Sequence, residues 1–348
     1  MTANGLALAP HKSECVVLTK KHSFRSPQIF VQGFQVPVKG NIRYLGVQLD
    51  TRLSFVAHAS TVAAGAKRSA VALGRLMTNV GGPSQCKRQL LMSVMHSRLL
   101  YGAQVWADSV VGVKKSEGLL QQAQRVAALR IARCYRTVSD MSSLVLARLP
   151  PAPLLALERR RASELRKTGV RFTSAELRSV TIQLWQAEWE KTSKASWTKA
   201  LIPDLNRWWH QGPRSVTFNM SQALTGHGCF QKYLCDRGKA ISPDCPHCFS
   251  LMDNAQHTIF DCPHWENARE ELRRSLGRPP GPEDVQELLC GPKIEDLPDD
   301  HAVRTRIMSS AARMKEEFWR MVENIMEAKQ AMERDRQSQP RQDLLHHN

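Results

Sequence analysis

The stretch CPHCFSLMDNAQHTIFDC (residues 245–262) carries three cysteines and a histidine in the spacing C-x2-C-x8-H-x4-C. Thiolate and imidazole are the ligands that Zn²⁺ prefers, and four of them close a tetrahedral structural site. A single buried cysteine usually acts as a small hydrophobic residue, but four such ligands at this spacing favour a metal. The sequence therefore predicts a structural Zn²⁺ site formed by the residues Cys245, Cys248, His257 and Cys262.

The remaining cysteines bear on whether these thiols are ligands or disulfide partners. The chain has nine cysteines in 348 residues. Its first thirty residues lack a charged segment followed by an apolar core, so no signal peptide is expected. No apolar run approaches the roughly 18–20 residues needed to span a bilayer, so no membrane partner is expected. The thiols are therefore expected to be reduced, which favours metal binding over disulfides. We interpret Cys229, Cys235 and Cys290 as ordinary thiols that take no part in the site.

The charge is concentrated in the N-terminal part of the chain. Lys and Arg number 49 against 32 Asp and Glu, a net charge of +17. Residues 1–150 hold 20 basic and 5 acidic side chains (+15), and residues 151–348 hold 29 and 27 (+2). Such a basic half indicates a polyanionic partner, most commonly nucleic acid. A basic surface without a partner remains the alternative.

Short segments near the N-terminus read as strands and the rest as helices. Residues 13–19, 28–36 and 42–49 are rich in β-branched and aromatic residues and are expected to be strands. Three strands are too few for a covered sheet domain, so they are expected to be the edge of a sheet whose other part lies outside this chain. From residue 55 apolar residues recur every three or four positions, which predicts helices. The prolines at 150–153 mark a boundary, and the tryptophans that follow are expected to pack in a core.

Several motifs resemble non-LTR (LINE-type) retrotransposon reverse transcriptases. The stretch GLALA at 5–9, followed by KSEC at 12–15, is similar to the segment after the catalytic palm motif. The stretch IRYLGVQLD at 42–50 resembles the end of the palm, and YGAQVW at 101–106 resembles a signature of the helical region that follows. The stretch TGHG at 225–228 resembles the C-terminal part of insect elements that insert in ribosomal RNA genes. The similarity runs in pieces over about residues 4–270.

The resemblance implies a mainly α fold with a small β portion: residual palm strands, a helical thumb and a helical C-terminal domain with a zinc knuckle. The expected domains are the end of the palm (1–52), a basic thumb-like domain (53–150), a Trp-rich helical connector (151–240), the CCHC zinc segment (241–276), a C-terminal loop and helix (277–333) and a disordered tail (334–348).

Catalysis is expected to belong to the parent polyprotein. An RNA-directed DNA polymerase of this family holds two Mg²⁺ ions on Asp residues, and these lie upstream of the GLALA stretch, as does the endonuclease domain. Residues 1–41 contain no Asp. We expect no catalytic residue in this chain, Mg²⁺ only in the missing palm, and partners that include the missing palm and endonuclease. Asp50 is interpreted as a turn or helix-capping residue.

The resemblance further implies binding of template–primer, element RNA or target DNA for target-primed reverse transcription in the nucleus. A thumb holds a duplex through phosphates, which carry no base information. The residues expected to do so, each with a solvated side chain as the alternative, are Lys12, Lys67, Arg68, Lys87, Arg88, Arg125, Arg130, Arg133 and Arg136. A zinc knuckle binds unpaired nucleic acid. Phe249, Leu251 and Met252 either form that surface or pack on the helix carrying Trp265.

Two other functions remain open at this stage. The first is a stand-alone or domesticated zinc-dependent nucleic-acid-binding protein without a polymerase role. The second is an enzyme with catalytic zinc, which would need an open coordination position. Four protein ligands argue against the second.

Overall fold

The computed structural model describes residues 9–21 and 23–338. These described residues group into two units: the first draws on Met1–Ala72, Ser93–Val126 and Pro151–Thr181, and the second draws on Leu73–Met92, Ala127–Pro150 and Ile182–Asn348. The expected motif at 5–9 lies outside the described residues except for Ala9, and so do residues 339–348 of the expected tail.

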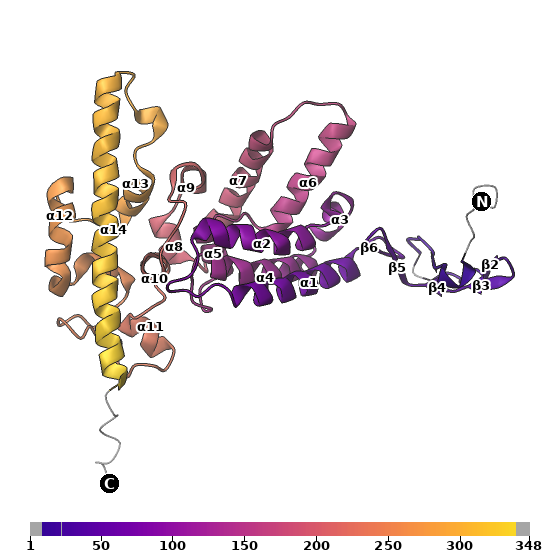
Figure 1. Cartoon of the computed structure of the whole chain (residues 1–348), viewed down its shortest axis with the longest axis horizontal. Coiled ribbons are helices and arrows are strands. Elements are labelled where there is room, and N and C mark those ends of the chain that lie inside the picture. Colours follow the sequence, from indigo (N-terminus) through magenta and orange to yellow (C-terminus); the bar gives the residue numbers. More distant parts are fainter. Residues whose placement is uncertain (1–8, 22, 339–348) are drawn as a thin grey trace, which may run out of the picture. The chain divides into compact units, whose positions relative to one another are not determined.

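Helices dominate the described residues and strands are few and short, which confirms a mainly α fold with a small β part (Figure 1). The longer helices are α1 (Val56–Gly74), α2 (Gln85–Leu99), α4 (Lys114–Ile131), α6 (Ala152–Lys167), α7 (Ser174–Lys191), α12 (Glu266–Leu276) and α14 (His301–Ser338). The shorter ones are α3 (Ala103–Val110), α5 (Asp140–Ala147), α8 (Ser196–Leu201), α9 (Leu205–Gln211), α10 (Phe218–Thr225), α11 (Gln231–Asp236) and α13 (Val285–Cys290).

The β part consists of two hairpins and one short parallel pair. The strands are β1 (Cys15–Val16), β2 (Ile29–Val31), β3 (Phe34–Val36), β4 (Val38–Lys39), β5 (Asn41–Tyr44) and β6 (Val47–Asp50), paired β1–β4, β2–β3 and β5–β6. The prediction of single strands over 28–36 and 42–49 was wrong, because each segment folds back on itself. Gln32-Gly33 and Leu45-Gly46 have φ of 50°, 77°, 45° and 86°. Positive φ at both central residues is the geometry of a two-residue hairpin turn.

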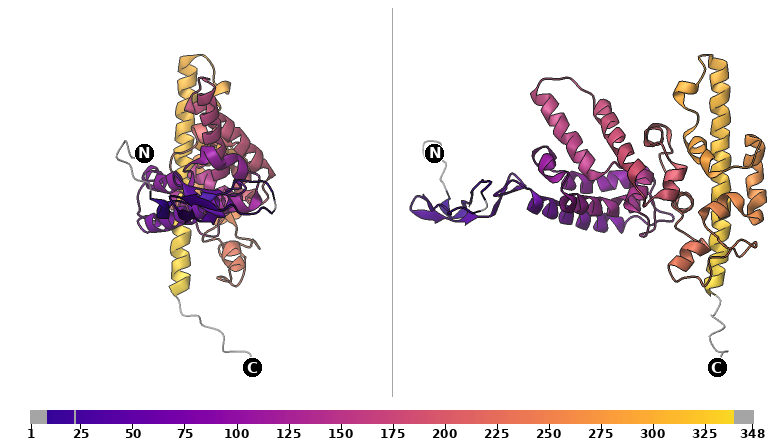
Figure 2. Two further views of the ribbon diagram at one scale, coloured as in Figure 1. Left: turned by 90° about the vertical axis from the view of Figure 1, so that its right-hand side faces the viewer. Right: turned by 180° about the vertical axis from the view of Figure 1, so that it is seen from behind.

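The helical part of the first unit is organised around Trp106. Helix α3 packs against α6, as Figure 2 shows from further sides. Trp106 is fully buried and its indole N–H donates to the Tyr101 carbonyl at 2.9 Å. The Arg159 guanidinium donates to the Leu100 carbonyl at 2.7 Å and so joins α6 to the end of α2.

Helix α14 is the central element of the second unit. It packs against α10, α12 and α13, and Figure 1 shows it in yellow beside α12. Its buried face contains Phe318, Met321, Val322, Ile325 and Met326. The helix continues to Ser338, past residue 334 where the tail was expected to begin. The Glu333–Arg336 ion pair at 2.7 Å lies in this extra turn.

Five tryptophans between residues 185 and 209 were expected to pack in a core, and three of them are fully buried in the second unit, namely Trp185, Trp189 and Trp208. The Trp189 indole N–H donates to the Ile202 carbonyl at 2.8 Å, and that of Trp208 donates to the Val145 carbonyl at 2.9 Å. The indole N–H of Trp185 has no partner among the described residues, but all three rings are buried, so these tryptophans serve packing.

Candidate metal centre and nucleic-acid surfaces

The four predicted ligands come together in one cluster. The sulfurs of Cys245 and Cys262 are 3.8 Å apart, those of Cys248 and Cys262 are 4.0 Å apart, and the Cys248 sulfur is 3.3 Å from Nε2 of His257. All four donor atoms lie within 4.8 Å of one another. Thiolates about 2.3 Å from a tetrahedral Zn²⁺ would be about 3.8 Å apart, whereas a disulfide requires about 2.05 Å. The cluster therefore fits a closed tetrahedral zinc site.

Two turns of the backbone present these ligands. The Cys245 amide donates to the Ser250 carbonyl at 2.9 Å, which closes the loop that carries Cys248. Asn254 Oδ1 accepts from the His257 amide at 2.8 Å and starts a π-helical turn, η3 (His257–Asp261). The Cys262 amide donates to the His257 carbonyl at 2.7 Å. Because this bond spans five residues, it returns Cys262 to the side of the chain that carries His257.

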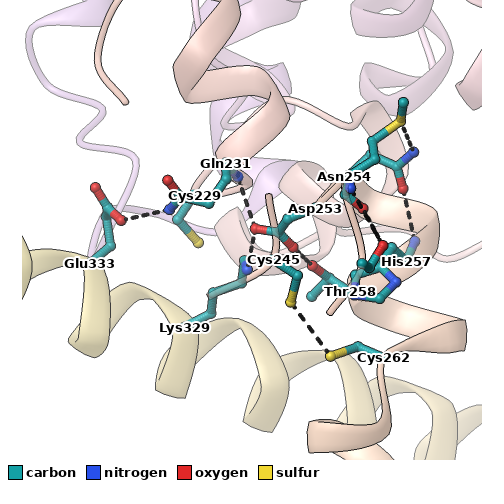
Figure 3. A network of polar contacts seen from close by, with 12 residues as sticks. Cys229, Gln231, Cys245, Asp253, Asn254, His257, Thr258, Cys262, Lys329 and Glu333 are labelled. Carbon is teal, nitrogen blue, oxygen red and sulfur yellow. Dashed lines mark hydrogen bonds and ion pairs between the residues drawn. The ribbon is translucent and has the colours of Figure 1, made fainter. Parts of the chain in front are cut away.

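A buried ion pair anchors the ligand loop to α14. The carboxylate of Asp253 lies 2.7 Å from Nζ of Lys329, and both side chains are fully buried (Figure 3). The same carboxylate accepts a hydrogen bond from the backbone N–H of Gln231 at 2.8 Å and another from the Thr258 hydroxyl at 2.6 Å. Sequence analysis missed this pair. The available signal was a lysine at position 329, one helical turn beyond Ile325 and Met326 on the apolar face of α14.

The surroundings of the clustered thiols of Cys245 and Cys262 keep them protonated unless a cation is bound. Burial and the neighbouring thiol groups raise the pKa of Cys262 to about 12, and burial likewise raises the pKa of Cys245. Burial also lowers the pKa of His257, which favours its neutral imidazole. Ligation requires thiolates and a neutral imidazole, and a divalent ion would supply the charge that stabilises adjacent thiolates. Cys229, Cys235 and Cys290 are not part of the cluster.

The loop between the ligands exposes apolar side chains. Phe249 and Leu251 are 106% and 80% exposed, Met252 is 47% exposed, and Ile241 just before the cluster is 104% exposed. Trp265 instead contacts His247 and His264, whose rings stack at 4.3 Å. Of the two alternatives for this loop, the structure favours an exposed surface. We call Ile241, Phe249 and Leu251 the knuckle tip.

Two of the predicted phosphate-binding arginines hold the backbone instead. Arg88 is fully buried and donates to the carbonyls of Thr78, of Pro83 at 2.8 Å and of Arg130 at 2.8 Å. Burial, together with the charges of Arg133 and Arg130, lowers the pKa of Arg88 to about 10. Arg133 donates to the Pro83 carbonyl at 3.1 Å. Their guanidinium groups are engaged within the fold, which corrects the expectation for Arg88 and Arg133.

The other predicted basic residues are divided between the two units. Lys12, Lys67 and Arg68 are exposed and Arg125 is half-buried, and these four belong to the first unit. Lys87, Arg130 and Arg136 are exposed and belong to the second unit. Their side chains lie at the surface or near it, as a phosphate contact requires, and they come from both units.

A basic hollow in the first unit contains one predicted residue and two that sequence analysis missed. It has a volume of about 530 Å³ and is lined by three arginines, Arg43, Arg68 and Arg98, together with His58 and Tyr101. Arg98 donates to the Ser69 hydroxyl at 2.7 Å. The basic hollow concentrates three positive charges at exposed side chains, which suits an anionic ligand.

Two motifs from the sequence analysis meet at this hollow. The Tyr101 hydroxyl donates to the Leu45 carbonyl at 3.0 Å. A Cβ on Gly46 would lie 2.8 Å from the Tyr101 ring, and one on Gly102 would lie 2.8 Å from Cγ2 of Val47. Both glycines also have positive φ. The segments 42–50 and 101–106 therefore need glycine at these positions in order to pack together.

Asp50 has the structural role that the sequence predicted. Its carboxylate accepts from the amides of Ser54 at 3.0 Å and Phe55 at 2.7 Å, just before α1. Although burial alone would raise its pKa, these hydrogen bonds and one from the Arg52 amide hold the pKa of Asp50 below its usual value. The carboxylate thus caps the turn into the first helix.

Among the described residues, no helix is long and apolar enough to cross a membrane. No family model and no solved structure matches the chain. Related proteins are the 115 kDa protein of the type-1 retrotransposable element R1DM from Drosophila melanogaster and an R1 Pol polyprotein from Bradysia coprophila. They are 25% identical to this chain over 73% and 74% of its residues. An R1 Pol polyprotein from Nasonia vitripennis is 25% identical over 73% of the chain and 68% of its own length.

The chain spans 27% and 28% of the length of the first two relatives. The relatives confirm the resemblance to non-LTR retrotransposon proteins that the motifs predicted.

Proposed function

We propose, from the relationship of this chain to retrotransposon Pol polyproteins, that it is the C-terminal part of a reverse transcriptase and binds nucleic acid. In this assignment residues 1–52 end the palm, 53–150 form the thumb, 151–240 form the connector and 241–276 form the zinc knuckle. The polymerase and endonuclease chemistry, with its Mg²⁺ ions, belongs to the parent polyprotein, which acts in the nucleus.

The observation that supports this function best is the knuckle tip. Phe249 and Leu251 extend into solvent on the loop between the clustered ligands, a loop that the Asp253–Lys329 ion pair also holds, and Ile241 is exposed just before the first ligand. Apolar side chains exposed on a fixed loop usually mark a binding surface. The aromatic ring of Phe249 can stack on an unpaired base, whose face a paired base would hide, and the aliphatic side chains of Ile241 and Leu251 add apolar contact beside it.

Zinc is the proposed metal, and its role is structural. Cys245, Cys248, His257 and Cys262 would hold it, and it would cross-link the two turns that carry them. The segment has little core of its own, so this cross-link would hold the loop in place. With four protein ligands no coordination position is left for a substrate.

The basic hollow supplies the second contact in this proposal. Arg43, Arg68 and Arg98 would neutralise phosphates of a template–primer duplex without reading its sequence. The knuckle tip would meanwhile hold an unpaired stretch of element RNA or target DNA. Together these contacts match the needs of target-primed reverse transcription, in which a paired primer end adjoins single strands.

The test measures single-strand affinity of the full chain. Phe249→Ser with Leu251→Ser should weaken binding of a single-stranded RNA about tenfold, because each stacked base contributes about 1–3 kcal/mol. The matched control is Val303→Ser with Met308→Ser, two exposed apolar residues on α14. Zinc content should stay unchanged in both. Equal single-strand affinity of the tip and control variants would refute the role of the knuckle tip.

A further inference from the structure

A pocket of about 470 Å³ lies in the second unit beside the metal cluster. Its walls come from α5 and the residues just before it, from α8, from the turn after α10, from α11, and from Met252 and residues 254–256 of the ligand loop. Pockets that hold small molecules measure about 300–1,000 Å³. The volume therefore suits a ligand about the size of a mononucleotide.

Three aromatic rings line this pocket, and each is held in place. The Thr137 hydroxyl lies 2.9 Å from Nδ1 of His227 and 2.7 Å from the Tyr233 hydroxyl, and the two rings are 5.0 Å apart. The indole N–H of Trp197 donates to the Ala223 carbonyl at 2.8 Å. Burial and the nearby Arg237 lower the pKa of His227 to about 4, so its ring is neutral. The pocket therefore offers flat, uncharged surfaces that need little reorganisation to stack on a base.

The rim of the pocket is positively charged. Lys194, Lys232 and Arg237 line it, and Asp236 is the acidic residue among the lining side chains. Lys232 is paired with Asp236 at 2.5 Å. Within the described part of the chain, no carboxylate lies within ion-pair distance of Lys194 or Arg237. Arg237 instead sits 5.7 Å from the Tyr233 ring centroid. Cationic side chains next to aromatic faces match a base with its phosphate.

The ligand loop connects the pocket to the cluster. Met252, Asn254, Ala255 and Gln256 line the pocket and lie between Cys248 and His257. The Lys232 amide also donates to the Asp253 carbonyl at 3.0 Å, which joins α11 to the same loop. One wall of the pocket is thus set by the fold of the proposed zinc loop.

We infer that this pocket takes one unpaired nucleotide of a looped or bulged nucleic acid, its base against Trp197 and Tyr233 and its phosphate at Lys194 and Arg237. The inference rests on the proposed function and names the ligand of its knuckle region. A free mononucleotide has the same chemistry, so the experiment must separate the two sources.

The probes are an RNA hairpin with a single bulged 2-aminopurine, the same hairpin fully paired, and adenosine monophosphate. The full chain should bind the bulged hairpin about tenfold more tightly than the paired one, since stacking on aromatic side chains supplies that difference. Lys194→Gln with Arg237→Gln should abolish the preference, and so should Ser196→Trp, which fills the mouth from an exposed rim position. Both variants should keep their zinc.

The matched control is Lys191→Gln with Lys239→Gln, which removes two exposed charges outside the pocket and should keep the preference. Equal binding of bulged and paired hairpins by the unmodified chain, or a preference that survives both pocket variants, would overturn the inference while leaving nucleic-acid binding intact. Adenosine monophosphate that displaces the bulged hairpin at comparable concentration would assign the pocket to a free nucleotide. Absence of binding to every RNA would instead refute the proposed function.

Discussion

The ion pair of Asp253 and Lys329 links the ligand loop to a helix 76 residues further along the chain. Each side chain alone is a poor candidate for burial, because a lone charge in the core is costly. Sequence patterns report neighbours three or four residues apart and not such distant pairs. The cluster of the four candidate ligands was predictable from their spacing, whereas the contact that orients their loop was not.

Removing one partner of this pair should destabilise the second unit. Lys329→Met leaves a buried carboxylate unpaired, which costs about 3–5 kcal/mol when a buried pair is broken. Adding Asp253→Asn should recover part of the loss, because the charge is then gone. Urea unfolding of the zinc-loaded chain measures both effects. Arg306→Met, an exposed change on the same helix, is the control; a Lys329→Met chain as stable as this control would contradict the proposed anchor.

The arginines that hold the backbone show a second limit of prediction from sequence at the residue scale. Arg88 and Lys87 are adjacent and equally basic in the sequence. In the structure Arg88 is buried on three backbone carbonyls, while Lys87 is exposed. One residue step on a helix rotates a side chain by about 100°, so neighbours face different environments. Composition predicts a basic region but not which of its side chains remain available.

At the scale of elements, the helices and the strand-containing segments were predictable, but the hairpin turns within those segments were not. The helical segments have apolar residues at regular spacing over many turns, whereas the strands have two to four residues. Segment 28–36 looked like one strand because apolar residues occur on both sides of Gly33. The positive φ at Gln32 and Gly33 turns it into a hairpin. Likewise, the turn from His257 to Cys262, which we call the metal turn, is π-helical. The spacing of apolar residues does not distinguish a single π-helical turn from an α-helical one.

The metal turn itself leads to a prediction about ligand removal. Cys248→Ser or Cys262→Ser should release one Zn²⁺ per chain and expose residues 240–270 to protease, because the loop loses its cross-link. Zinc affinity should also fall as pH falls, since Cys245 and Cys262, with raised pKa values, take up protons that compete with the metal. Metal analysis and limited proteolysis measure these outcomes.

Cys235→Ser is the matched control for the metal turn, because this thiol lies nearby but outside the cluster. It should keep its zinc and its protease resistance. A chain purified without chelator that contains no zinc would refute the metal assignment. A Cys235→Ser chain that loses zinc while Cys262→Ser keeps it would refute the ligand set.

At the scale of the whole chain, charge and apolar surface serve different contacts. Residues 1–150 carry +15 of the net +17, and the basic hollow belongs to this part. The knuckle tip and the aromatic and charged residues that line the pocket of about 470 Å³ lie in the part whose net charge is only +2. Phosphate contacts depend steeply on salt, whereas stacking depends on it much less. The two kinds of contact should therefore separate when salt is varied.

We accordingly expect the arginines of the basic hollow to determine how steeply duplex affinity falls as salt is raised. Each neutralised phosphate contributes roughly 0.9 to the slope of log K against log salt. Changing Arg43, Arg68 and Arg98 together to Ala should flatten the slope for a duplex by about 0.9 for every phosphate that is no longer neutralised. The control changes Lys20, Lys114 and Lys115 together to Ala; these three residues are exposed outside the hollow. This control should change the slope less. If both triple variants lower the slope equally, the duplex senses only net charge, and the hollow is not its binding site.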